Sequence, residues 1–255
     1  MTPKNAASRP KLDVGYWERM ASKYDDEIFD SLQHDKSRVI LQEIRKSRRR
    51  GGAIADMGCG IGKYLPVLGR MFDEVAGYDS SQGCVDISRK KMAGKANIAV
   101  GLASSALPRG RGRFDVVLCV NVLLDPVVRA RSAITRTLVA LMAPGGRLIL
   151  VVPSLESAML LAEAEADESK GKRRSGKPYW DVAKHDGGIV AIGGVPTKHF
   201  SGQELRAAVA ALGLAVRRVK RVEYSWQSHS LAATRKLRGK RPWDWIVVAD
   251  RAVSS

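Results

Sequence analysis

Three glycines at alternate positions stand between an apolar run and a helical pattern early in the chain. Residues 55–64 read ADMGCGIGKY, so Gly58, Gly60 and Gly62 directly follow the apolar run at 53–57. Glycine lets the backbone turn sharply and lets a ligand approach the main chain closely. Open α/β sheets bind their ligands at such a turn after a strand. The segment therefore predicts a ligand-binding loop, although glycine-rich turns by themselves are common.

An acidic residue follows this loop at a spacing that has a chemical meaning. Asp79 ends the second apolar run, about twenty residues beyond the glycines. In nucleotide-binding folds a carboxylate at this place accepts hydrogen bonds from ribose hydroxyls, and it has two oxygens to offer. The alternative is that Asp79 only starts the turn at Ser80 and Ser81. Because loop, spacing and strand end agree, ribose binding is the favoured interpretation.

The elements that must position these residues follow from an alternation of short apolar runs with helical patterns. We expect strands at 53–57, 74–78, 97–100, 114–120, 147–152, 214–224 and 243–249, and helices at 63–72, 81–92, 127–142 and from Ser201 onward. Strands that are apolar throughout and alternate with helices predict a parallel sheet covered on both faces. Before the first strand, residues 15–45 predict two amphipathic helices, with Ser31 as the cap between them.

Residues 154–200 interrupt this alternation. They predict a helix at 155–167, a charged glycine-containing loop at 168–177 and a hairpin at 187–194. Since the alternation resumes at Ser201, we interpret the segment as a cap inserted into one domain. Tyr179 and Trp180 of this cap are candidates for lining a substrate pocket.

Four segments together resemble a known family. DMGCGIG, VAGYDSS, FDVVLCVNVLLD and APGGRLILVVP, within residues 53–153, are similar to the small-molecule group of class I methyltransferases, which use S-adenosylmethionine (SAM); residues 201–252 are similar too. Dinucleotide enzymes carry G-x-G-x-x-G, whereas here the glycines alternate and an acidic residue precedes them, which favours SAM over NAD. The resemblance implies an α/β, Rossmann-like, seven-stranded, mostly parallel sheet with a reversed last strand and helices on both faces. It also implies a tail and helical lid at 1–50 and a SAM-binding domain at 51–255, with the 154–200 insertion after the fifth strand.

The resemblance assigns the cofactor to residues at the carboxyl ends of the expected strands. Asp56 would help to hold the methionine end of SAM, and Asp79 would bind the ribose. The other implied contacts are Gly58, Cys59 and Gly60 beneath the sugar and amino acid, Tyr78 and Ser80 beside the adenosine, Leu102 and Ala103 in the adenine loop, and Asn121 and Val122 at the methionine portion. Many members have an acidic residue where this chain has Leu102, so one adenine contact is lost unless a backbone carbonyl replaces it. Cys59 is expected to be a small packing residue, because nothing nearby in the sequence would activate it as a nucleophile.

Methyl transfer requires alignment of the acceptor and exclusion of water, and some acceptors also need a base. In the N-terminal helices, Tyr24 is a candidate to cover the sulfonium with its aromatic face; the alternative is that it packs on the sheet. Tyr16 is a weaker candidate for the same role, and Trp17 is expected in the core. No metal is required.

Candidates for the base come from two regions. Asp125, just after the fourth expected strand, would act as a base or an orienting group, or would instead cap the helix that begins near Pro126. Among the histidines, His185 in the insertion is preferred, and each is individually more typical of a surface or packing residue. The others are His34, His199 and His229.

Basic residues outnumber acidic ones, with 43 Lys and Arg against 26 Asp and Glu and a formal net charge of +17. Such a field attracts anions, so an anionic small acceptor fits, and RNA would fit clusters at 45–50, 109–113, 170–177, 217–221 and 235–241. However, aromatic residues make up only 6% of the chain, and the clusters are scattered, which favours a solvated basic face.

The three cysteines indicate neither a disulfide framework nor a zinc site. No apolar run is long enough to span a membrane, so we expect a cytoplasmic protein, with its oligomeric state open.

The sequence thus predicts a SAM-dependent methyltransferase that acts on an oxygen or nitrogen of a small molecule and releases S-adenosylhomocysteine (SAH). An RNA methyltransferase and a SAM-binding protein without turnover are the alternatives. A nicotinamide oxidoreductase is disfavoured by the glycine spacing.

Overall fold

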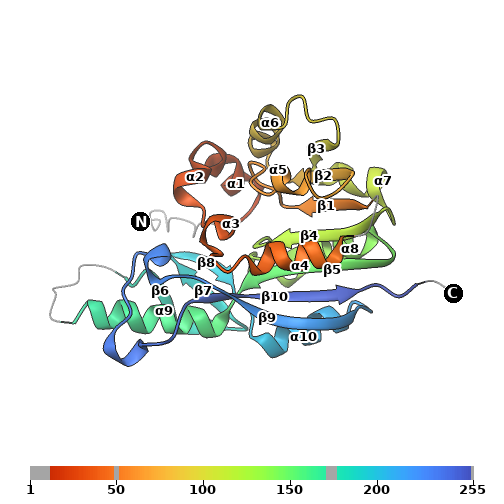
Figure 1. Cartoon of the computed structure of the whole chain (residues 1–255). Coiled ribbons are helices and arrows are strands. Elements are labelled where there is room, and N and C mark those ends of the chain that lie inside the picture. Colours follow the sequence, from red (N-terminus) through yellow and green to blue (C-terminus); the bar gives the residue numbers. More distant parts are fainter. Residues whose placement is uncertain (1–11, 49–51, 171–176, 254–255) are drawn as a thin grey trace, which may run out of the picture.

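A seven-stranded mixed sheet forms the centre of the chain (Figure 1). The computed structural model describes residues 12–48, 52–170 and 177–253. The strand order is β3-β2-β1-β4-β5-β10-β9. The strands are β1 (Ala53–Met57), β2 (Glu74–Asp79), β3 (Ile98–Leu102), β4 (Phe114–Val120), β5 (Met142–Pro153), β9 (Ala215–Glu223) and β10 (Trp243–Asp250). Neighbours from β3 to β5 are parallel, and β10 runs antiparallel to both β5 and β9. The expected reversed last strand is confirmed.

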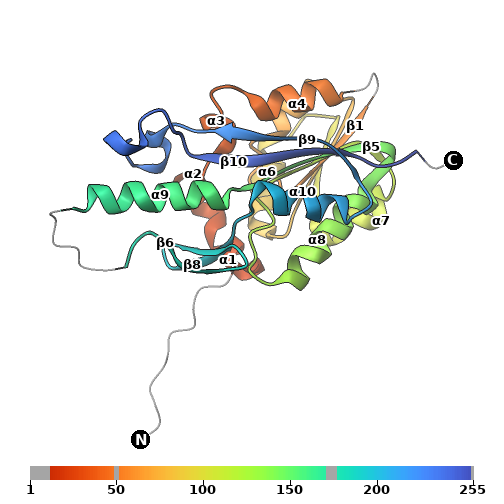
Figure 2. The same cartoon turned by 90° about the horizontal axis from the view of Figure 1, so that it is seen from below.

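Helices cover both faces of this sheet, as the alternation predicted. Successive residues of a strand point to opposite faces, and each face has its own core: Ile54 and Leu118 pack with α4 (Val39–Ser47) and α5 (Leu65–Leu68). On the other face, residues of β1, β4 and β5 pack with α8 (Val128–Leu141) and α10 (Gly202–Ala210). Figure 2 shows α4 on one side of the strands and α8 and α10 on the other. The remaining helices beside the sheet are α6 (Gln82–Lys91) and α7 (Ala106–Gly110), of which α7 was not expected.

The N-terminal segment differs from the expected pair of helices. It forms α1 (Val14–Met20), a 3₁₀ turn at Ala21–Lys23, α2 (Tyr24–Glu27) and α3 (Ser31–His34) before α4. Ser31 is not the cap: the Asp30 carboxylate accepts a hydrogen bond from the Gln33 backbone N–H at 2.9 Å, so α3 begins one residue earlier than a Ser31 cap requires. A side chain can cap a helix only from the position before its first turn, and here Asp30 holds that position. Of the expected polar tail at 1–12, residues 1–11 lie outside the described residues.

The insertion consists of α9 (Leu155–Glu168) and a three-stranded antiparallel sheet of β6 (Trp180–Asp186), β7 (Ile189–Ile192) and β8 (Val195–Lys198). The segment 187–194, predicted as a hairpin, instead holds one strand, β7, with a turn at each end; glycines with positive φ form these turns at 187–188 and 193–194. The Glu165 carboxylate accepts hydrogen bonds from the backbone N–H groups of Tyr179 and Trp180, at 2.8 and 3.0 Å, and so ties α9 to β6. Part of the expected charged loop, 171–176, lies outside the described residues. The insertion and α1–α3 lie at the same end of the large sheet (Figures 1 and 2).

Candidate functional site

The glycine loop connects β1 to α5 in a conformation that only glycine adopts readily. Gly58, Gly60 and Gly62 have φ values of 78°, 52° and 83°. The backbone N–H groups of Gly58 and Cys59 donate to the Tyr78 carbonyl, at 2.7 and 3.0 Å, which anchors the loop to β2. A Cβ atom at Gly58 would overlap the Val122 side chain, and one at Gly60 would overlap the ring and hydroxyl of Tyr24. Positive φ and close approach together explain why glycine occupies these positions.

Asp79 lies beside this loop, at the carboxyl end of β2. Its Oδ2 accepts a hydrogen bond from the Gly60 N–H at 2.8 Å, and its Oδ1 accepts one from the Ser81 N–H at 2.9 Å. Burial raises the pKa of Asp79, while these backbone hydrogen bonds oppose the shift. The carboxylate faces a cavity of about 250 Å³, called here the small cavity. Its lining also includes Ser80, Ala103, Val122 and three residues of α8, namely Ala133, Ile134 and Thr137.

Tyr24 and Trp17 close one side of the small cavity. Burial and the nearby Asp79 carboxylate raise the pKa of Tyr24, so its hydroxyl stays protonated at neutral pH. The expectation that Trp17 belongs to the core is wrong. No residue of α1 is buried, and Trp17 is half-buried. Its side chain lines both cavities instead of packing in the core.

Glu18 fastens α1 to the N-terminus of α6. Its Oε2 accepts a hydrogen bond from the Ser81 hydroxyl at 2.7 Å, and its Oε1 accepts one from the Gly83 N–H at 3.0 Å. The hydrogen bond from Ser81, followed by that from Gly83, lowers the pKa of Glu18. This contact holds the segment that carries Trp17 and Tyr24 against the glycine loop.

A second and larger cavity, of about 840 Å³, adjoins the first; it is called here the large cavity. It lies among α1–α3, the ends of β1, β4 and β5, α9, the β6–β8 sheet, residues 228–231 and the start of β10. The two cavities share the lining residues Trp17, Tyr24, Gly58, Val120 and Asn121. A ligand at the glycine loop and a ligand in the large cavity would therefore meet at these residues.

Two buried oxygens at this junction have no hydrogen-bond partner among the described residues, namely Asp56 Oδ2 and Asn121 Oδ1. Asp56 is only 2% exposed, and burial, followed by repulsion from Asp79, raises its pKa to about 7. Asn121 has a left-handed backbone with φ of 54°, which is uncommon outside glycine. Buried polar groups are normally paired, so both oxygens indicate a place for a ligand with hydrogen-bond donors.

The Asn121 side chain is held by a residue at the other end of the chain. Asp244, at the start of β10, accepts hydrogen bonds at Oδ2 from the Asn121 Nδ2–H at 2.9 Å and from the Tyr224 hydroxyl at 2.8 Å. Burial raises the pKa of Asp244 to about 6, against the effect of these two donors. Asp244 lines the large cavity.

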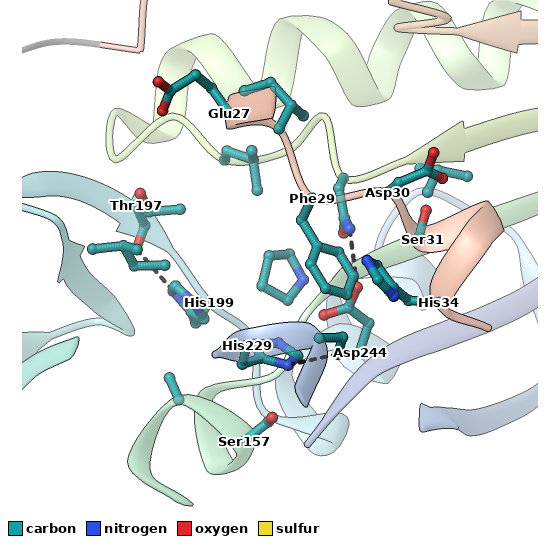
Figure 3. Close-up of a pocket in the computed structure, with 18 of the residues that line it drawn as sticks. Glu27, Phe29, Asp30, Ser31, His34, Ser157, Thr197, His199, His229 and Asp244 are labelled. Atoms are coloured by element: carbon teal, nitrogen blue, oxygen red, sulfur yellow. Dashed lines mark hydrogen bonds between the residues drawn. The ribbon is translucent and has the colours of Figure 1, made fainter. Parts of the chain in front are cut away.

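Three histidines also line the large cavity: His34, His199 and His229. Figure 3 shows all three facing the same space as Asp244. His199 is 2% exposed, with its Nδ1 3.1 Å from the Thr197 carbonyl oxygen. Burial lowers the pKa of both His199 and His229 to about 4, so both imidazoles are neutral at pH 7.

Only one of the two preferred candidates for the base, Asp125, has a side chain that the structure describes. Asp125 lines neither cavity, and its Oδ1 accepts a hydrogen bond from the Val127 N–H at 2.7 Å, as a turn-forming residue before α8 does. His185 is part of β6, and its side chain lies outside the described residues. Tyr16, Tyr179 and Trp180 do line the large cavity.

The expected cofactor residues fall into three groups. Tyr24, Gly58, Asp79, Ser80, Ala103, Asn121 and Val122 line the small cavity, and Asp56 and Cys59 line the large one. Gly60, Tyr78 and Leu102 line neither cavity. The Leu102 carbonyl accepts a hydrogen bond from the Ser105 hydroxyl at 2.7 Å. Burial raises the pKa of Cys59 well above its usual value, which supports its interpretation as a packing residue.

Sequence reasoning did not select Asp244, Tyr224 or Asp30. The signal for Asp244 was present, because a carboxylate inside the apolar strand Trp243–Asp250 must have a partner or a function. Among the described residues, no cluster of side chains suits a metal ion, and no helix is long and apolar enough to cross a membrane.

Residues 22–219 match the family described as "Methyltransferase domain". The chain belongs to the class I SAM-dependent methyltransferases. Its cofactor is therefore SAM, and the nicotinamide alternative is set aside.

Individual relatives cover only part of the chain. It is 32% identical over 129 residues to the tRNA (carboxymethyluridine(34)-5-O)-methyltransferase ALKBH8 of Macaca fascicularis, covering 50% of this chain and 18% of that protein. It is 28% identical over 146 residues to the O-methyltransferase cnsE of Penicillium expansum, covering 54% of this chain and 50% of the relative. The chain thus spans half or less of the length of these relatives.

Solved structures share the fold. One is described as a DhpI–SAH complex, with a TM-score of 0.59, 16% identity, and coverage of 94% of this chain and 96% of the other. Another is a SAM-dependent methyltransferase from Methanosarcina mazei, with a TM-score of 0.58, 16% identity, and coverage of 83% and 98%.

Proposed function

We propose that this methyltransferase acts on an oxygen or nitrogen of a small molecule that binds in the large cavity. The observation that carries the proposal is the junction of the two cavities at Tyr24, Gly58 and Asn121. An acceptor of drug-like size fits a cavity of about 840 Å³. The small cavity next to it would hold the adenosine end of the cofactor.

The residues around the glycine loop fit SAM. Asp79 has both oxygens fixed by backbone N–H groups, and its remaining lone pairs would accept the ribose hydroxyls. The unpartnered oxygens of Asp56 and Asn121 would accept from the ammonium group of the methionine portion. Ala103, Val122 and Ile134 offer apolar surface to the adenine.

The bound cofactor supplies a methyl group on a positively charged sulfur. The chain's own residues would align and shield the acceptor. Tyr24 lies over Gly60 and lines both cavities, so its ring would cover the reacting groups and exclude water. We assign the acceptor region to the 154–200 insertion and the covering segment, or lid, to the helices within residues 1–50.

A neutral imidazole would take the acceptor's proton when one must leave. His199 and His229 line the large cavity and are neutral at pH 7, since their pKa values are about 4. These two are preferred to Asp125, which lies away from both cavities; His185, whose side chain lies outside the described residues, stays a candidate. The cytoplasmic location expected from the sequence stays a prediction.

RNA is the second candidate acceptor, favoured by the similarity to a tRNA methyltransferase over half of the chain. The basic cluster on β9 is a weak argument for it, because three of its four basic side chains already pair with acids. Arg217 pairs with Asp250 at 2.8 Å, and Arg218 and Lys220 pair with Glu43 at 2.9 and 2.8 Å.

Transfer of labelled methyl groups from SAM into a fractionated cell extract tests the proposal. We expect label in the low-mass fraction with the natural chain and none with Asp79→Ala. Label in RNA, with a rate that falls steeply as salt rises, would instead establish the RNA alternative. A folded chain that binds SAM but labels neither fraction would support the non-catalytic alternative.

A further inference from the structure

The large cavity has the opposite charge from the molecule as a whole. The chain carries a net charge of +17, yet among the described residues the charged side chains that line the large cavity are one lysine and six acids: Asp25, Glu27, Asp30, Asp56, Glu165 and Asp244. The lysine, Lys63, is already paired with Asp25 and Asp30 at 3.0 and 2.9 Å. Charges in contact with a ligand act at short range and low dielectric, so they outweigh a remote basic surface.

Most of these carboxylates already have a partner or lie away from the space that an acceptor would fill. Asp25 and Asp30 share Lys63, and Glu165 accepts two backbone hydrogen bonds. Asp56 lies at the glycine loop, where the cofactor is proposed to bind. Glu27 is exposed at the rim. This leaves Asp244 as the carboxylate inside the acceptor end of the cavity.

Asp244 is built to meet a ligand with one of its two oxygens. Its Oδ2 accepts from Asn121 and Tyr224, whereas Oδ1 has no hydrogen-bond partner among the described residues. The side chain is 9% exposed, and both donors are neutral. A buried carboxylate without a cationic partner is costly, so a cationic ligand group would be favoured there.

Aromatic rings stand directly beside this carboxylate. The Phe29 ring lies 4.8 Å from that of Tyr224 and 5.0 Å from those of His34 and His229, centroid to centroid. Tyr224 is itself a donor to Asp244. Figure 3 shows Phe29, His34 and His229 grouped around Asp244. Aromatic faces attract cations and stack with other rings, and His229 adds no positive charge because its pKa is lowered to about 4.

We propose that the acceptor is an aromatic compound with a protonated amine, whose ammonium group pairs with Asp244 while its ring packs against Phe29 and His229. This inference rests on the proposed function, because it concerns the acceptor end of the same site. It replaces the anionic acceptor that the net charge suggested.

Calorimetric titration of two matched compound series into the SAH-saturated chain tests this assignment. Phenethylamine, 2-phenylethanol and phenylacetate share one ring, and tryptamine, indole-3-ethanol and indole-3-acetate share another. We expect the amine of at least one series to bind about tenfold or more tightly than its alcohol, and the carboxylates to bind weakest. Equal affinities, tighter binding of the carboxylates, or no binding of either amine would overturn the proposal.

The variant Asp244→Asn sharpens the test because its amide oxygen still accepts from Asn121 and Tyr224. The readout is the ratio of amine to alcohol affinity within each variant, so a general disturbance of the site cancels. We expect this ratio to fall to near one in Asp244→Asn and to stay unchanged in Asp86→Asn, which removes the same charge from an exposed position on α6. Phe29→Leu should lower amine affinity several-fold. An unchanged ratio in Asp244→Asn would refute the role of Asp244.

The two proposals fail in different ways. Normal SAH binding without preference for amines would refute the acceptor class alone. A folded chain that does not bind SAH would refute the proposed cofactor site itself.

Discussion

The small and the large cavity meet at Tyr24, Gly58 and Asn121, but they are assembled differently. The small cavity is centred on one loop and the next strand end, within residues 58–80, and is completed by α1, α2, α8, Ala103 and residues 120–122. The large cavity needs parts that lie far apart in the chain, from Leu12 to Asp244. Its carboxylate Asp244 holds Asn121 across 123 positions of sequence.

This difference separates what is common to the family from what is particular to this chain. A glycine loop with a carboxylate beside it can position the same cofactor in many proteins, because the geometry is local. The large cavity is made by an insertion, an N-terminal segment and the start of the last strand, so under the proposed function its shape and charge would select the acceptor. Variants in the two cavities should therefore have separable effects.

The largest expected effect lies in the glycine loop. Gly58→Ala would bring a Cβ into the Val122 side chain and would also strain a backbone with φ of 78°. We expect SAH affinity to fall about a hundredfold or more, equivalent to roughly 3 kcal/mol. Calorimetry gives the affinity. Gly94→Ala is the matched control, since Gly94 has φ of 79° but no atom within 4 Å of the added Cβ; it should lose about 1 kcal/mol of stability and no affinity. Equal loss of affinity in both variants would contradict the steric account.

An effect of similar size belongs to the large cavity and depends on pH. His199 titrates near pH 4 in the folded chain but at its ordinary value of 6.5 when unfolded. As pH falls from 6.5 to 4, the unfolded chain gains a proton that the folded chain does not, so the free energy of unfolding decreases by about 3 kcal/mol. His199→Gln should lose this contribution and keep that of His229, whose pKa is also about 4; urea unfolding of both proteins across that range measures it.

The buried carboxylates of the site change the free energy of unfolding with pH in the opposite direction. Burial raises the pKa values of Asp56 and Asp244 from 3.8 to about 7 and about 6, so their contributions to stability decline as pH rises from 3.8 through those values. Subtracting the free energy of unfolding of His199→Gln from that of the natural chain at each pH removes the contributions of these carboxylates. A difference that does not change between pH 6.5 and 4 would show that His199 is solvated and titrates normally.

The smallest expected effect concerns the segment over the small cavity. Glu18→Gln weakens the contacts with Ser81 and Gly83 that fasten α1 to α6. We expect SAH affinity to fall about two- to fivefold and amide hydrogen exchange to quicken at 14–27. Arg19→Gln, on the same helix, should leave both unchanged. Faster exchange without any loss of affinity would show that this segment does not cover the cofactor.

The same contrast, between a site formed by neighbouring residues and one formed by distant segments, explains what could be predicted from the sequence. Strand β4 was predicted at its observed bounds because a buried parallel strand is apolar throughout, and Asp79 was found by its spacing from the glycines. Helix α5 is shorter than predicted, at Leu65–Leu68, because the loop continues through turns up to Tyr64. The role of Asp244 depends on strand order, which brings β10 beside β5, and no local pattern contains that information. For the same reason Asp125 was a plausible base by position but lies outside both cavities.

Calorimetric titration of the natural chain and of Asp79→Ala with SAH tests the central claim most directly. If the small cavity holds the cofactor, the natural chain binds one SAH, and the variant, which loses the carboxylate that fixes Gly60 and Ser81, binds at least about a hundredfold more weakly. Circular dichroism of both proteins verifies that they are folded. Equal SAH affinity in the two folded proteins would contradict the assignment of the glycine loop and Asp79 as the cofactor site.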